Sequence, residues 1–134
     1  PNTAVSTKEV FARLTLPAEK EALTNVAKLN ILVDAVGNGL PLTSWTPLLF
    51  NRLEEAVVSL VAPVRQALSD VSQASGTIGR MSGSGSTVFA LVGTKQDAQE
   101  TAQRLKNTGM LVFPVSFYPG ATDANYRSQN SSDE

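Results

Sequence analysis

Serine and glycine alternate in one short run, Ser82–Ser86, and the residues on both sides of it limit the folds open to this chain. The run from Thr87 to Val92 is apolar and rich in β-branched residues, which is typical of a buried strand. Residues 77–81 predict a shorter strand before the loop. A strand on each side, with no Gly-Lys-Ser/Thr, excludes the phosphate loop of Walker-type nucleotide hydrolases and the dinucleotide fingerprint, which opens a helix.

The chemistry of this loop predicts that it recognises a phosphate group. Gly83 and Gly85 permit positive φ angles and let the backbone approach a ligand closely. Successive backbone N–H groups can form a concave anion site, to which the hydroxyls of Ser82, Ser84 and Ser86 can add donors. Glycine and serine are also ordinary turn formers, so a flexible β-hairpin with small turn residues is the alternative.

The rest of the chain predicts an α+β fold. Apolar periodicity and turn residues predict a single domain over residues 1–119, followed by a disordered polar tail over 120–134. Its sheet would have four strands, antiparallel or mixed, with the helices packed on one face. The expected helices span residues 6–14, 18–36, 48–62, 63–73 and 95–106, a loop spans 40–47, and the expected strands span 1–5, 77–81, 87–92 and 110–117.

Composition removes several classes of function. The chain has no Cys and no His, which excludes disulfides, thiolate and imidazole metal sites, and Ser-His-Asp or Cys-His catalysis. Its net charge of -1 offers no basic stripe for a nucleic acid. No apolar run is long enough to span a membrane and no secretory signal is visible. The absence of Cys fits a reducing cytosol, so a cytoplasmic location is expected. The first residue is Pro1 instead of Met, which suggests a processed or trimmed product.

Carboxylates are the remaining candidates for acid–base chemistry. Asp34, Glu54 and Glu55 are interpreted as residues of solvated helix faces, because Glu54 and Glu55 are neighbours whose side chains diverge on a helix. No catalytic residue and no metal ligand is therefore assigned within this chain.

Three segments together resemble one family. The segment Arg80-Met81-Ser82-Gly83-Ser84-Gly85-Ser86-Thr87-Val88-Phe89-Ala90-Leu91 is similar to the third motif of the GHMP kinases, and within them to the kinases that act on CDP-linked methylerythritol. Asn51-Arg52-Leu53-Glu54 resembles the Asn-Asp-Leu-Glu helix upstream of that loop. Val5-Ser6-Thr7-Lys8-Glu9-Val10-Phe11 is similar to the segment that opens the substrate-binding domain. The resemblance extends from residue 4 to about residue 118.

The resemblance implies a ferredoxin-like C-terminal domain and a kinase reaction. Such an enzyme transfers the γ-phosphate of ATP, with Mg²⁺, to the 2-hydroxyl of 4-diphosphocytidyl-2-C-methyl-D-erythritol in non-mevalonate isoprenoid synthesis. Carried over, Thr7 and Phe11 would line the cytidine pocket, with Phe11 stacked on the cytosine ring. Simple core packing of Phe11 is the alternative. Residues 82–86 would shape the site around the reacting hydroxyl and the phosphates.

Two departures from the family pattern limit what this chain can do alone. Arg52 replaces the usual acidic residue of the Asn-Asp-Leu-Glu helix. The ATP-binding N-terminal domain, with its catalytic Asp and Lys, is not in this sequence, so the chain alone is expected to be inactive and to need that domain as its partner. A different GHMP kinase, such as a homoserine or mevalonate type, and a non-catalytic α+β binding module remain the alternatives.

Overall fold

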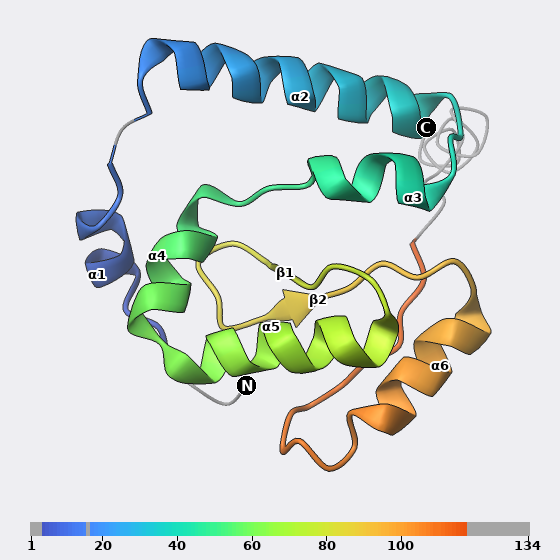
Figure 1. The fold of residues 1–134 in the computed structure, drawn as a ribbon. Helices are drawn as coiled ribbons and strands as arrows, with labels where there is room; N and C mark the ends of the chain where they lie inside the picture. Colours follow the sequence, from blue (N-terminus) through green and yellow to red (C-terminus); the bar gives the residue numbers. More distant parts are fainter. Residues whose placement is uncertain (1–3, 16, 118–134) are drawn as a thin grey trace, which may run out of the picture.

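A computed structural model describes residues 4–15 and 17–117, and it confirms the α+β class (Figure 1). Helices come first along the chain, and a small β-hairpin and a last helix follow. The predicted tail over 120–134 lies outside the described residues, as do residues 1–3. The elements are α1 (Thr7–Ala12), α2 (Glu19–Gly37), α3 (Leu42–Trp45), the 3-10 helix η1 (Thr46–Leu48), α4 (Arg52–Leu60), α5 (Ala62–Ser75), β1 (Arg80–Met81), β2 (Val88–Phe89) and α6 (Lys95–Arg104).

Local capping chemistry explains where several helices begin and end. Ser6 precedes α1, and its hydroxyl accepts a hydrogen bond from the backbone N–H of Glu9. Thr94 and Asp97 form the capping box that starts α6. Pro63 lies in the first turn of α5, where a missing N–H costs no helical hydrogen bond. Gly76 ends that helix with a φ of 69°, a conformation that favours glycine.

The prediction of a loop over residues 40–47 is wrong, because α3 and η1 occupy most of it. Pro41 precedes α3, and the indole N–H of Trp45 donates to the carbonyl of Leu40 at 3.2 Å, which closes this short helical stretch. The next helix begins at residue 52 and not at 48. Asn51 sets that boundary because its side-chain oxygen accepts the N–H of Leu53 at 3.0 Å.

The described residues form a two-stranded antiparallel sheet. Arg80 pairs with Phe89 and Met81 pairs with Val88. The predicted strands over 77–81 and 87–92 are therefore present, but each is reduced to two residues.

The C-terminal turn of α5 explains why β1 starts late. The N–H of Gly79 donates to the hydroxyl of Ser72 at 2.8 Å, and the N–H of Thr77 donates to the hydroxyl of Ser75 at 3.2 Å. These amides bond to the helix, so they cannot extend the ladder with β2.

The predicted strand over 110–117 is not formed, and residues 4 and 5 form none either, so the four-stranded sheet stays a prediction. Met110 and Val112 pack beside the core, whereas Leu111 is 85% exposed and Phe113 is 75% exposed. Alternating apolar residues predict a strand, but the strand forms only where a neighbouring strand supplies its backbone hydrogen bonds. No described segment pairs with this one.

The core lies between α5 and the β-hairpin, with α1, α4 and α6 around it (Figure 1). Its first cluster of buried side chains joins α1, α4, α5 and β1, and its second joins α5 to the end of α6. Val88 of β2 packs against both. The first cluster contains Val10, Val57, Val64 and Met81, and the second contains Val71, Ala74 and Leu105.

Helix α2 lies apart from this core, along the top of Figure 1, and packs on α3 and η1. Ala35 is its buried residue. Val26, Leu29, Val33 and Val36 recur at spacings of three and four, and each is about half exposed or more. Among the described residues, no helix combines the length and apolar character needed to cross a membrane.

Candidate functional site

The serine–glycine loop is the tight turn between β1 and β2. The N–H of Ser82 donates to the carbonyl of Thr87 at 2.9 Å, and the N–H of Gly85 donates to the carbonyl of Ser82 at 3.0 Å. Gly83 has a φ of 55° and Gly85 a φ of 81°, so both positions use the left-handed region that glycine adopts without a steric cost.

Two backbone donors of the loop remain available to a ligand. Among the described residues, none accepts a hydrogen bond from the N–H groups of Gly83 and Ser84. Ser82 and Gly83 are exposed, and Ser84, Gly85 and Ser86 are half-buried. Neighbouring amides in such a turn can bind an anion together, which is compatible with the phosphate recognition expected from the sequence.

The underside of the loop is packed on the core beside the start of α1. A Cβ atom added at Gly85 would lie 3.0 Å from the Sδ atom of Met81 and 3.6 Å from methyl groups of both Val5 and Val57. The loop is a hairpin turn, but its second half is supported by buried side chains. An unsupported turn in open solvent is therefore the wrong description.

Asn51, at the start of α4, binds the loop through its side-chain amide. Its Nδ2 atom donates to the carbonyl of Met81 at 2.9 Å and to the carbonyl of Gly83 at 2.7 Å. Its Oδ1 atom meanwhile accepts the N–H of Leu53. One side chain thus caps a helix and binds two carbonyls at the β1 end of the turn.

Glu54 binds the same end of the loop, which corrects the prediction of a solvated face for this residue. Its Oε2 atom accepts the N–H of Met81 at 2.7 Å, and its Oε1 atom forms an ion pair with Arg80 at 3.3 Å. Its side chain is 19% exposed. Asp34 and Glu55 are exposed, as predicted.

The spacing of Asn51 and Glu54 is the signal that sequence reasoning missed. A capping residue followed three positions later by Glu places both side chains at the first turn of a helix. In a capping box the Glu side chain bonds the N-cap amide, whereas here it reaches across to the N–H of Met81. The spacing of Asn51 and Glu54 shows that their side chains lie near each other, but it does not show that both bond to β1.

Arg52, the departure from the family pattern, points away from the loop toward the segment before α2. Its guanidinium donates to the carbonyl of Thr15 at 2.9 Å and forms an ion pair with Glu21. Arg52 therefore connects α4 to α2, and no contact with residues 82–86 replaces the missing carboxylate.

The two residues predicted to line a cytidine pocket lie on α1. Thr7 is exposed in the first turn, and Phe11 is 55% exposed. Val10 takes the core position of this helix and is 1% exposed, so core packing is the wrong description of Phe11. A half-exposed aromatic ring is free to stack on a planar ligand.

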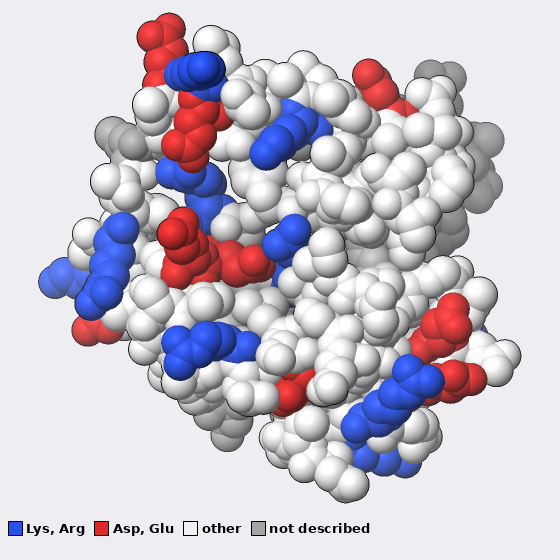
Figure 2. Space-filling model, viewed as in Figure 1, with Lys and Arg blue, Asp and Glu red and all other residues white. Residues whose placement is uncertain are grey.

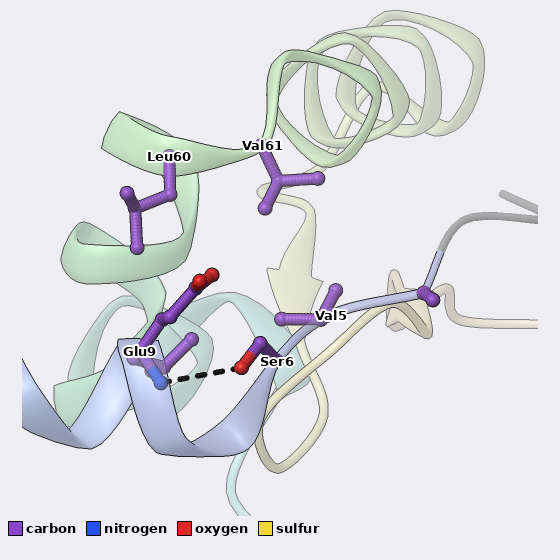
Figure 3. Close-up of a pocket in the computed structure, with 7 residues that line it drawn as sticks. Val5, Ser6, Glu9, Leu60 and Val61 are labelled. Atoms are coloured by element: carbon purple, nitrogen blue, oxygen red, sulfur yellow. Dashed lines mark hydrogen bonds between the residues drawn. The ribbon is translucent and has the colours of Figure 1, made fainter.

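A hollow of about 310 Å³ lies between the start of α1 and the junction of α4 with α5 (Figure 3). Thr7 and Phe11 do not line it. Val5 lines it and also contacts the underside of the loop at Gly85, so the hollow adjoins the loop. Its lining residues are Ala4, Val5, Ser6, Glu9, Val10, Leu60 and Val61.

A second hollow, of about 410 Å³, lies on the other side of α4. Charged side chains of both signs line this hollow: Lys28, Arg80, Glu54 and Glu55. Figure 2 shows acidic and basic side chains close together on the left of this face and again at its lower right, with a largely uncharged surface at the upper right. Within residues 4–15 and 17–117, no three His, Cys, Asp or Glu side chains meet in a way that could hold a metal ion.

Comparison with known proteins agrees with this geometry. The family model for the C-terminal part of the GHMP kinases matches residues 33–109, which is more than half of the chain. Three curated proteins named 4-diphosphocytidyl-2-C-methyl-D-erythritol kinase are similar to 79–80% of it. Those from Nitrobacter hamburgensis and Nitrobacter winogradskyi are each 30% identical, and that from Mesorhizobium japonicum is 34% identical.

The chain spans only 34–36% of the length of these relatives. No solved structure gives a significant match. The matched region contains the hairpin with its serine–glycine loop and also α4, whose first turn binds the loop. The chain belongs to the GHMP kinases and forms a C-terminal domain of that family.

Proposed function

We propose that this chain is the substrate-side part of a kinase that transfers the γ-phosphate of ATP to the 2-hydroxyl of 4-diphosphocytidyl-2-C-methyl-D-erythritol. The reaction would belong to non-mevalonate isoprenoid synthesis, in the cytoplasm. Three relatives that carry this name, each similar to about four fifths of the chain, support the substrate. The observation that carries the proposal is the core-supported loop, two of whose amides donate to no residue that the structure describes.

The loop suits phosphoryl transfer, because that reaction depends on positioning and on donors that stabilise developing negative charge. The N–H groups of Gly83 and Ser84, with the loop hydroxyls, would bind phosphate oxygens next to the reacting hydroxyl. Phe11 would stack on the cytosine ring, and Thr7 would lie beside it on the same helix. The predicted ferredoxin-like class of the domain belongs to this proposal.

ATP and Mg²⁺ would be held mainly by a companion N-terminal domain. The described part of this chain fits a phosphate group at the loop but gathers no set of carboxylates for a metal ion. The length of the relatives leaves room for such a domain. The chain alone would therefore bind substrate without turning it over.

The test is a kinase assay on the full-length protein with ATP, Mg²⁺ and the CDP-linked methylerythritol. ADP release coupled to a phosphomonoester signal in ³¹P NMR is the expected result, and homoserine and mevalonate are expected to give none. Turnover of either of those instead would favour a different GHMP kinase. The absence of turnover with all three would favour a non-catalytic binding module.

Replacing Phe11 with alanine is expected to raise the KM for the CDP-linked substrate about tenfold. Stacking of a base on an aromatic ring contributes roughly 1–3 kcal/mol, and 1.4 kcal/mol corresponds to a factor of ten. Phe113→Ala is the matched control, since Phe113 is also exposed but lies far along the chain from α1. Equal KM values for the two variants would contradict the stacking role.

A further inference from the structure

The shape of the loop depends on hydrogen bonds from α4. The N–H groups of Ser82 and Gly85 donate to carbonyls within the turn, and the first turn of the helix adds three hydrogen bonds. Asn51 supplies two of these and Glu54 the third. Helix α4 is itself fixed in the core by Val57, which is fully buried. The loop is therefore attached to a rigid element at its β1 end.

The bond from Asn51 to Gly83 determines the direction of a neighbouring donor. The peptide bond between Gly83 and Ser84 is trans, so its carbonyl and its N–H point in opposite directions. Since the carbonyl of Gly83 is held toward Asn51 at 2.7 Å, the N–H of Ser84 must point away from α4. This amide is one of the two that donate to no described residue.

The peptide unit between Met81 and Ser82 obeys the same rule. The carbonyl of Met81 is held by Asn51 at 2.9 Å, and the N–H of Ser82 points the other way, to the carbonyl of Thr87. Asn51 thus fixes two peptide planes of the turn at once. Without it, the Gly83–Ser84 plane can rotate, because glycine permits both orientations.

We propose that Asn51 is a positioning residue of this kinase, which holds the Ser84 amide toward the transferred phosphate by binding the carbonyl of the same peptide unit. The inference rests on the proposed function for its catalytic consequence. In this role Asn51 acts through the loop backbone and not through the substrate. A donor that is already oriented contributes to the transition state without reorganisation, and removal of one such donor lowers kcat by a factor of roughly 100–1,000 in enzymes that use them.

Asn51→Asp in the full-length protein separates this role from helix capping. Aspartate is as good an N-cap as asparagine, so α4 keeps its start. The two N–H donors are lost, and two carbonyls then face a carboxylate. We expect kcat to fall about 100-fold, with the KM values for ATP and acceptor changed less than threefold.

The matched control is Asn38→Asp. Asn38 also donates through Nδ2 to a backbone carbonyl, that of Asp34 at 2.7 Å, but it lies at the end of α2. Its variant is expected to keep wild-type kcat. If Asn51→Asp loses no more kcat than this control, or loses it only in parallel with KM, the positioning role is wrong.

A readout without catalysis distinguishes failure of this inference from failure of the proposed function. In ¹H–¹⁵N NMR spectra of the full-length protein, Asn51→Asp should shift the amide signals of Ser82 and Ser84, and Asn38→Asp should not. Unchanged loop signals would overturn the inference whatever the protein phosphorylates. If Asn51→Asp does not fold, Asn51→Ser keeps a capping oxygen and is too short to hold both carbonyls, so the same shifts and the same kcat loss are expected.

Discussion

Replacing Gly85 with alanine is expected to lower the free energy of unfolding by about 3 kcal/mol. The φ of 81° at this position costs a residue with a Cβ atom about 1–2 kcal/mol. The added methyl group would also lie 3.0 Å from Met81 Sδ, with Val5 and Val57 at 3.6 Å, and overpacking of a filled core costs about 1–3 kcal/mol.

Thermal and denaturant unfolding of the variant measure this effect. Gly83→Ala is the control, because Gly83 also has a positive φ, 55°, but its added Cβ would meet nothing within 4 Å. The control is expected to lose only about 1 kcal/mol, from the backbone term alone. Equal losses in the two variants would show that Gly85 is not packed against the core.

Replacing Met81 with alanine is expected to cost about 3 kcal/mol as well, for the opposite reason. Its side chain is 2% exposed and lies in the first cluster with Val10, Val57 and Val64, so truncation leaves a cavity. Met110→Ala is the control, since Met110 is only half-buried beside the second cluster. The smaller loss expected there is about 1 kcal/mol.

The two changes should be non-additive, because they act on the same atoms. The cavity left by Met81→Ala removes the sulfur atom that the methyl group of Gly85→Ala would meet. The double variant is therefore expected to lose about 1–2 kcal/mol less than the sum of the single losses. Simple additivity would contradict the close approach of Gly85 to Met81.

The helices could be predicted from sequence because their signals are local. The capping residues Ser6 and Thr94, the first-turn Pro63 and the terminal Gly76 mark boundaries that the structure confirms within one or two residues. The strands could not be predicted as well. The length of each strand depends on which acceptor every backbone N–H finds. The N–H of Gly79 donates to the hydroxyl of Ser72, so it cannot extend β1.

The site shows the same division between local and distant signals. The turn between two strands and the positive φ angles of Gly83 and Gly85 follow from the residues themselves, and the structure confirms them. The bonds from Asn51 to Met81 and Gly83 join residues 30 and 32 positions apart. No local pattern contains that information, and for the same reason the buried role of Glu54 was missed.

Helix α2 should open and close independently of the rest of the domain. Its backbone is covered by α3 and η1 and not by the main clusters, so its amides should exchange with solvent deuterium long before those of α5. The family match begins at residue 33 and leaves most of this helix outside. A segment that can unfold by itself can also be lengthened, shortened or replaced during evolution with little effect on the part of the domain that holds the serine–glycine loop.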